Sequence, residues 1–237
     1  MSQRLLVVGA HSADFVWRSA GAIAVHTAAG GEAKVVALSY GERGESGELW
    51  REPGQTEANV KRIRHAEASA AAGILGADFE GFDAGDYPLR LDDQAIDRLA
   101  ALIREFAPEI ILTHPAKDPF NPDHPTAAAA VARARLLAAG AGVASAFETV
   151  PPSQLLAFEP HQPDLCEFVP TEFVDITSVF ELKVAAMQEM KAQKYLQEYY
   201  AQRAEHRANH ARKVSGRKEV RYAEAFQRLL PKVVAGL

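Results

Sequence analysis

Short apolar runs alternate with longer Ala-rich segments over the first two thirds of the chain. Runs with the length of a buried strand cover residues 4–9, 34–39, 109–113 and 154–158, with weaker ones at 78–82 and 172–176. Segments with helical character lie between them, at residues 16–29, 56–75, 92–106 and 125–139. Near-continuous apolar strands that alternate with helices are typical of a parallel sheet with both faces covered. We therefore predict an α/β fold with a Rossmann-like, mainly parallel sheet and helices on both faces.

The last quarter of the chain has a helical pattern. Residues 179–212 predict a long surface helix, either continuous or broken, and residues 213–220 have the composition of a turn. We expect a final helix at about 221–230 that packs back on the body. Because no repeat or linker interrupts the chain, residues 1–237 are predicted to form a single domain, whose helical C-terminal extension covers about 178–237.

Bulk composition narrows the class of protein. The 237 residues are 48% hydrophobic and carry a net charge of −5, so no basic field indicates a nucleic-acid partner. No apolar stretch approaches the roughly 18 residues that a membrane-spanning helix needs. Cys166 is the only cysteine, which excludes an intrachain disulfide framework, and charges with a polar break at His11 make residues 1–20 unlike a signal peptide. We expect a cytoplasmic enzyme that forms a homo-oligomer and binds no membrane.

Metal-binding residue types follow two of the predicted strands. His11 and Asp14 come directly after the first apolar run, and Asp118 and His124 follow the run at 109–113. The carboxyl ends of parallel strands meet at one edge of a sheet. Taken alone, His11 could pack locally and Asp14 could complement a helix dipole. Three N and O ligands, such as His11, Asp14 and His124, together with an open coordination position are typical of a catalytic zinc.

We therefore predict a metal site formed by His11, Asp14 and His124. Two imidazoles and a carboxylate suit Zn²⁺, and Fe²⁺, Co²⁺ and Mn²⁺ remain alternatives.

Other loops at the same predicted edge carry groups that could move protons. Glu45 lies in the glycine-flanked loop 41–46, where it is the first candidate, with Glu42 second. His161 is held between two prolines, a restricted position that suits a proton donor or acceptor. His114 ends a strand, and its pattern does not decide between support of a ligand and a place in the core.

Cationic side chains near these loops are candidates for anion binding, because guanidinium groups bind carboxylates through paired hydrogen bonds. Arg43 and Lys117 lie inside the loops themselves and are predicted to bind substrate. Arg18, Arg51 and Arg64 lie near the same strand ends and rank below Arg43 and Lys117 as candidates, because most arginines simply solvate a surface.

Two motifs resemble those of the PIG-L/LmbE-like zinc-dependent N-acetylglucosaminyl deacetylases. Residues 10–14 (A-H-S-A-D) are similar to the family's A-H-P-D-D, and residues 121–124 (N-P-D-H) to its H-P-D-H. The resemblance implies that His11, Asp14 and His124 are the metal ligands, the same three residues that the spacing indicates.

The sequence departs from the deacetylase motifs at two positions. The family's aspartate base falls on Ala13, and the histidine that helps to stabilise the oxyanion falls on Asn121. With these departures, the loops 11–15, 41–46, 117–125 and 158–163 resemble the 4-oxalomesaconate (4-carboxy-2-hydroxymuconate) hydratase branch of the family. That resemblance implies addition of water to a carbon–carbon double bond of a small tricarboxylate, a step of gallate and protocatechuate catabolism.

In this interpretation Glu45 and His161 are the catalytic residues, and Asn121 joins Arg43 and Lys117 in binding substrate. Hydration releases no amine, so it does not need the deacetylase base. A carboxylate at position 13 would also repel a trianionic substrate. A zinc-dependent N-deacetylase of an acetylated amino-sugar, with its base elsewhere, is the second hypothesis. A catalytically silent metal-binding member is the third, and the presence of Glu45 and His161 argues against it.

Overall fold

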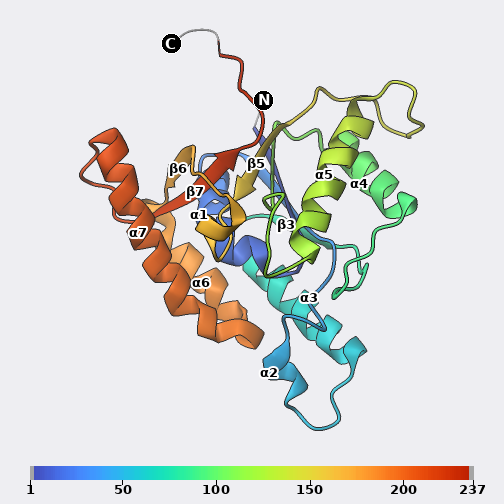
Figure 1. Cartoon of the computed structure of the whole chain (residues 1–237), viewed down its shortest axis with the longest axis horizontal. Helices are drawn as coiled ribbons and strands as arrows, with labels where there is room; N and C mark the ends of the chain where they lie inside the picture. Colours follow the sequence, from blue (N-terminus) through green and yellow to red (C-terminus); the bar gives the residue numbers. More distant parts are fainter. Residues whose placement is uncertain (1–2, 235–237) are drawn as a thin grey trace.

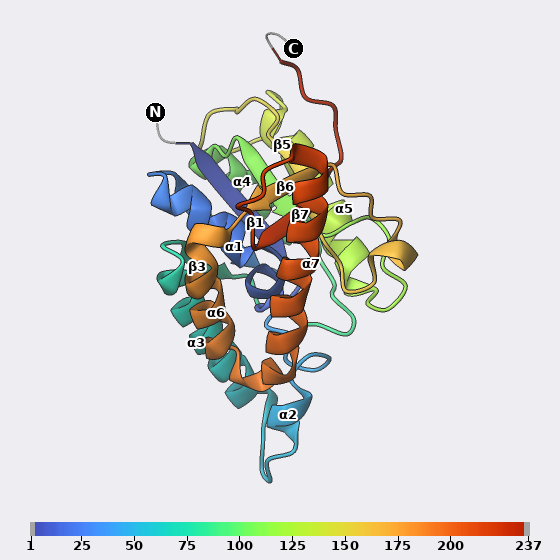
Figure 2. The ribbon, with the colours of Figure 1, turned by 90° about the vertical axis from the view of Figure 1, so that its left-hand side faces the viewer.

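One sheet separates two layers of helices (Figures 1 and 2). The computed structural model describes residues 3–234. The strands of these residues are β1 (Arg4–Gly9), β2 (Glu32–Ala37), β3 (Asp78–Gly81), β4 (Ile110–Thr113), β5 (Gln154–Phe158), β6 (Glu172–Asp175) and β7 (Ala223–Arg228). They lie side by side in the order β3-β2-β1-β4-β5-β7-β6. The predicted α/β fold is confirmed.

The strand order reverses direction at β1. The chain builds outward through β2 and β3, then returns to add β4 and β5 on the other side, all five strands being parallel. In register, Val7 of β1 lies beside Val35 of β2 and Leu112 of β4. Loops that leave the carboxyl ends of strands flanking such a reversal diverge and open a crevice. The loops after β1 and β4, which carry the predicted metal ligands, are those loops.

Helices cover both faces of the sheet, as predicted. They are α1 (Asp14–Ala28), α2 (Gly47–Trp50), α3 (Glu57–Ile74), α4 (Asp93–Phe106), α5 (Asp123–Ala139), α6 (Phe180–Glu189) and α7 (Gln197–Ser215), with 3-10 turns η1 (Pro163–Cys166), η2 (Thr177–Val179) and η3 (Lys191–Leu196). Successive strand residues point to opposite faces. Val7 belongs to the buried apolar cluster that includes residues of α1, α3, α6 and α7, whereas Val8 belongs to the cluster that includes residues of α4 and α5. In Figure 1, α4 and α5 lie on one side of the sheet and α6 and α7 on the other.

The C-terminal region is only partly as predicted. The long helix is broken, because Gln193 in η3 has non-helical backbone angles between α6 and α7. The final helix expected at 221–230 is wrong: this segment forms β7, which pairs antiparallel with β5 and β6. Phe226 lies opposite Phe158 in this ladder, and buried Glu224 accepts a hydrogen bond from Lys183 Nζ at 2.6 Å. Pairing and burial outweigh the modest helical preference of this Ala- and Glu-containing segment.

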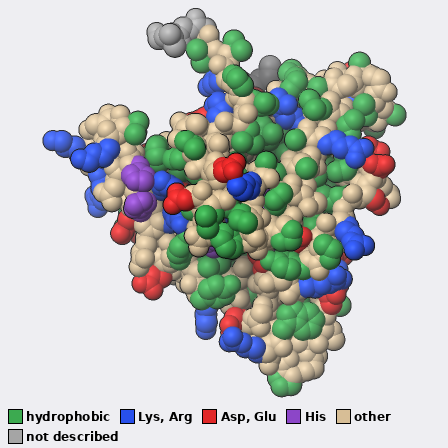
Figure 3. Space-filling model, viewed as in Figure 1, with side chains coloured by type: hydrophobic (Ala, Val, Ile, Leu, Met, Phe, Trp, Pro, Cys, Tyr) green, Lys and Arg blue, Asp and Glu red, His purple; other side chains and the backbone are tan. Residues whose placement is uncertain are grey.

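Among residues 3–234, no helix is both long enough and apolar enough to cross a bilayer. Acidic and basic side chains are interspersed on the face shown in Figure 3, in line with the small net charge.

Candidate active site

His11 and Asp14 stand on the turn between β1 and α1. Oδ2 of Asp14 accepts a hydrogen bond from the backbone N–H of His11 at 2.8 Å, which ties the two residues together. The turn depends on Gly9, because a Cβ there would lie 2.9 Å from Cβ of Asp14. His124 lies in the first turn of α5, and all three side chains are buried. The structure thus brings together the three predicted ligands from two loops about a hundred residues apart in sequence.

A carboxylate orients each of the two imidazoles. Nε2 of His11 lies 3.3 Å from Oδ2 of Asp123, and Nδ1 of His124 lies 2.7 Å from Oδ2 of Asp118. When a carboxylate takes the N–H of one ring nitrogen, the other nitrogen is left with a lone pair. Those other nitrogens, Nδ1 of His11 and Nε2 of His124, are buried and have no hydrogen-bond partner within residues 3–234. Two enclosed, unpaired lone pairs are what metal coordination would satisfy.

Two further carboxylates face these nitrogens. Oε1 of Glu45 lies 3.2 Å from Nδ1 of His11 and 4.0 Å from Nε2 of His124. Oδ2 of Asp14 lies 3.6 Å from Nδ1 of His11, and its Oδ1 lies 3.8 Å from Nε2 of His124. Of the described residues, His11, Glu45 and His124 form one group able to hold a metal, and Asp14, His114 and His124 form another. The donor set of imidazoles and carboxylates fits a divalent cation such as zinc.

Protonation states agree with cation binding. Burial, reinforced by His114, holds the pKa of His124 well below its usual range, so its lone pair is available at neutral pH. Burial alone would raise the pKa of Asp14, but His114, His11 and Arg18 hold it well below its usual range. The site therefore presents a neutral imidazole and an ionised carboxylate, which are the metal-binding forms.

His11 shows the opposite shift. Burial acts to lower its pKa, but Glu45, Asp123 and Asp14 together raise it well above the usual range. Surplus negative charge around this ring therefore attracts a proton, and a divalent cation would compete for the same position.

Glu45 is held by two side-chain amides. Nδ2 of Asn121 donates to Oε1 of Glu45 at 3.1 Å, and Nε2 of Gln193 donates to Oε2 at 3.4 Å. Gly41, with φ of +70°, makes the turn, because a Cβ there would lie 3.2 Å from Cβ of Glu45. No sequence pattern indicates a role for Gln193, which lies in η3, 148 residues after Glu45 in the chain.

Glu42, the second candidate in this loop, is turned away from the predicted ligands. It is fully buried, accepts a hydrogen bond from the backbone N–H of Tyr40 at 3.2 Å and lies 3.4 Å from Nζ of Lys61. The structure thus brings only Glu45 of the pair to the metal-binding group.

His114 supports the ligands. Its Nε2 lies 2.9 Å from Oδ2 of Asp14, and its ring stacks on that of His124 with centroids 3.9 Å apart. The sequence does not decide whether His114 supports a ligand or packs in the core. In the structure it is fully buried and contacts both Asp14 and His124.

Arg43 and Lys117 lie on the surface rather than among the buried ligands. Nε of Arg43 lies 3.1 Å from Glu57, and Nζ of Lys117 lies 2.5 Å from Glu167. Both side chains are about half exposed, at 50% and 53%. In this conformation each cation is paired with an exposed carboxylate of the protein itself.

His161 follows β5 and packs against α7. Its Nδ1 lies 3.3 Å from the hydroxyl of Tyr200, and its carbonyl accepts hydrogen bonds from Tyr199 and Arg203. Burial, together with the charge of Arg18, lowers the pKa of His161 to about 4. The imidazole is therefore neutral in the free protein at neutral pH. It lines a cavity of about 520 Å³ with several residues of α7.

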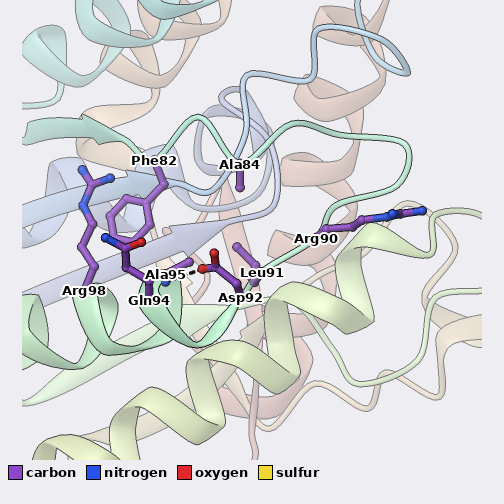
Figure 4. Close-up of a pocket in the computed structure, with 8 residues that line it drawn as sticks. All are labelled: Phe82, Ala84, Arg90, Leu91, Asp92, Gln94, Ala95 and Arg98. Atoms are coloured by element: carbon purple, nitrogen blue, oxygen red, sulfur yellow. Dashed lines mark hydrogen bonds between the residues drawn. The ribbon is translucent and has the colours of Figure 1, made fainter.

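A larger hollow lies elsewhere, between the loop after β3 and the start of α4 (Figure 4). Its volume is about 790 Å³, and Phe82, Arg90 and Arg98 are among its lining residues. It contains none of the predicted site residues, and Arg98 is already paired with Glu80 and packed over the Phe82 ring.

Comparisons with known proteins place this arrangement in a family. The PIG-L family model, described as GlcNAc-PI de-N-acetylase, matches residues 6–135. A 4-oxalmesaconate hydratase of Pseudomonas putida is 48% identical over 98% of this chain and 91% of its own length. The crystal structure of GalB, the 4-carboxy-2-hydroxymuconate hydratase of Pseudomonas putida, superposes with a TM-score of 0.96 at 47% identity, covering 99% of each chain.

Similarity to deacetylases is weaker and shorter. A 1D-myo-inositol 2-acetamido-2-deoxy-alpha-D-glucopyranoside deacetylase of Rhodococcus erythropolis is 30% identical over 52% of this chain and 49% of its own length.

Proposed function

The chain belongs to the PIG-L family, and we propose that it is a hydratase that adds water to a carbon–carbon double bond of 4-oxalomesaconate, also named 4-carboxy-2-hydroxymuconate. The observation that carries the proposal is the match to hydratases over nearly the whole chain, whereas the deacetylase match covers about half of it. The site agrees, because Ala13 and Asn121 replace the two groups that amide hydrolysis requires in this family.

The proposal assigns one divalent cation to His11, Asp14 and His124. The two unpaired imidazole nitrogens, each oriented by a carboxylate on the opposite side of its ring, support this assignment. Zn²⁺ is the first choice, and Fe²⁺, Co²⁺ and Mn²⁺ fit the same donors. When bound, such an ion supplies Lewis acidity and lowers the pKa of water to about 7.

Glu45 and His161 carry the proton transfers in this proposal. Glu45, held by Asn121 and Gln193, accepts a proton from water as the water oxygen bonds to one carbon of the double bond. The π electrons move to the neighbouring carbon, which takes a proton from His161. Because the pKa of His161 is about 4 in the free protein, this histidine acquires its proton only when the anionic substrate binds nearby and raises that pKa.

The proposed partner is a small tricarboxylate. Asn121 would contact the substrate from beside Glu45, and Arg43 and Lys117 would do so after release from Glu57 and Glu167. The proposal includes a cytoplasmic setting and a homo-oligomeric state. Size-exclusion chromatography with light scattering measures the oligomeric state directly.

The alternatives are not favoured. A deacetylase would need a base to serve the leaving amine, and Ala13 cannot accept a proton. A silent protein would have no use for a carboxylate held by two amides beside unpaired imidazole nitrogens.

The test is to incubate Zn²⁺-loaded protein with the enol tricarboxylate and to follow the loss of its conjugated absorbance. Release of acetate from an N-acetylated amino-sugar is measured in parallel, and chelator-treated protein is the control. Absorbance loss that depends on the metal, without acetate release, is expected. Acetate release without hydration would overturn the proposal.

A further inference from the structure

Arg18 is a buried arginine whose guanidinium has unused hydrogen-bond donors. It lies in α1, one turn after Asp14, and is 4% exposed. Its Nε and Nη1 are enclosed and have no hydrogen-bond partner within residues 3–234. The carboxylate beside it, Oδ1 of Asp14, lies 3.4 Å from Nε but outside hydrogen-bond geometry.

The other buried arginines of the described region are satisfied. Arg64 donates to Tyr40, Glu67 and Gln193, and Arg104 donates to backbone carbonyl groups around the end of α5. Arg207 donates to Glu159 through two nitrogens. Arg18 is therefore an exception among buried arginines of the same chain. Burying a guanidinium without hydrogen bonds is costly, and arginine cannot shed its charge at neutral pH.

Arg18 lies between the proposed metal-binding group and His161. Its charge acts on Asp14, Glu45 and Asp118 on one side, and it lowers the pKa of His161 on the other. Its Cζ lies 5.7 Å from the centre of the Phe158 ring, at the end of β5. The free donors therefore lie within electrostatic reach of both groups to which the proton transfers are assigned.

We propose that Arg18 is the residue that binds one carboxylate of the tricarboxylate substrate, an inference that rests on the proposed function. A carboxylate presents two acceptor oxygens that match the planar guanidinium, and it would satisfy the donors that the protein leaves free. Arg43 and Lys117 are less suited to dominate recognition, because each is half exposed and already paired. Arg18 would thus distinguish a substrate with a carboxylate at this position from one without it.

A bound water is the competing explanation. Arg18 borders a cavity of about 20 Å³ that it shares with Trp17, Lys183 and Tyr200, and a cavity of roughly 10–15 Å³ or more can hold one water. If water satisfies the guanidinium, loss of Arg18 would alter stability but not the recognition of carboxylates.

The experiment compares Arg18→Met and Arg18→Lys with the wild type, using Arg62→Met on the exposed face of α3 as the matched control. Calorimetry with Zn²⁺-loaded protein measures binding of tricarballylate, an unreactive tricarboxylate, and of the dicarboxylate glutarate. Metal content and melting temperature are recorded for every variant. Loss of a charge-assisted contact predicts that Arg18→Met weakens tricarballylate binding about ten- to a hundredfold, weakens glutarate binding less, and retains zinc. Arg18→Lys should recover part of the loss.

Unchanged tricarballylate binding by a folded, zinc-containing Arg18→Met protein would overturn the proposal in favour of the bound water. Equal weakening for both ligands would overturn the discrimination assigned to Arg18, because Arg18 would then contact a carboxylate that glutarate also carries. Should the wild type bind tricarballylate through Arg18 but fail to hydrate the enol tricarboxylate, the proposed function would be wrong while the anion site would stand.

Discussion

Nδ1 of His124 lies 2.7 Å from Oδ2 of Asp118, while Nε2 of the same ring is buried without a hydrogen-bond partner among residues 3–234. The hydrogen bond fixes which nitrogen carries the proton and aims the other toward Asp14 and Glu45. Asp118 therefore acts on the proposed metal through His124 rather than by direct contact.

The first prediction follows from this pair. Asp118→Asn should weaken metal affinity about 10- to 100-fold, the usual effect of losing such a carboxylate partner. His124→Ala should lower both metal content and activity more severely, because a ligand is lost. Metal content by mass spectrometry, after dialysis against graded zinc concentrations, measures both effects. Full metal occupancy in a triple His11, Asp14 and His124 alanine variant would refute the ligand assignment.

The location of the site could be predicted from the sequence because strand ends carry recognisable signals. Apolar runs placed His11 and His124 after β1 and β4, and the topology confirms that these strands are neighbours. Of the two carboxylates that orient these imidazoles, Asp118 is a local partner, because it lies in the loop just before His124. Asp123 orients His11 across 112 residues of sequence, and it reaches that ring only because β1 and β4 are neighbours.

Long-range partners could not be predicted in this way. Gln193 reaches Glu45 only because the break between α6 and α7 turns its side chain inward. The sequence ranks Arg18 below Arg43 and Lys117 because most arginines solvate a surface, but the packing of β5 and α7 encloses Arg18. The strand β7 has helix-forming residues, and its place in the sheet depends on pairing with β5, which no local pattern encodes.

Ala13 provides the second prediction. Its side chain is fully buried at the N-cap of α1, directly before the proposed ligand Asp14 in sequence, so Ala13→Asp would add a second buried carboxylate next to that ligand. Hydration should fall, and no useful deacetylase activity should appear. Ala13→Asn is the matched control, because Asn has similar size and caps helices equally well but carries no charge. An Ala13→Asp protein that hydrates at the wild-type rate would show that position 13 does not affect the chemistry.

Glu45 and Gln193 provide the third prediction. Glu45→Gln should reduce kcat by about 10²–10⁴, the usual contribution of a general base, with metal content retained. Gln193→Leu removes the donor to Oε2 and should lower kcat by up to about 10²-fold through misplacement of the carboxylate. Gln188→Leu, on the exposed face of α6, is the control. If Gln193→Leu lowers only the melting temperature and leaves kcat unchanged, Gln193 has a purely structural role.

The fourth prediction concerns the surface cations. Arg43→Ala and Lys117→Ala should each raise KM about tenfold or more if a charge-assisted contact is lost. The kcat of both variants should stay near the wild-type value. Each residue must first leave Glu57 or Glu167, so the effect should increase in Glu57→Gln and Glu167→Gln backgrounds, where less competition exists. Steady-state kinetics of the four single and two double variants measures this. An unchanged KM in both alanine variants would remove Arg43 and Lys117 from the site.

The last prediction uses the shifted pKa of His161. The pKa is about 4 in the folded protein and about 6.5 in an unfolded chain. Between these values the unfolded chain binds a proton that the folded protein does not, so this residue makes the protein less stable as the pH falls from about 6.5 to 4. His161→Gln removes that contribution. Urea unfolding at several pH values should therefore show the wild type losing more stability toward pH 4 than the variant, and parallel curves would contradict the shift. In the same variant the alkaline limb of the kcat profile should disappear or move, because the wild-type limb reports the protonated His161 that forms in the substrate complex.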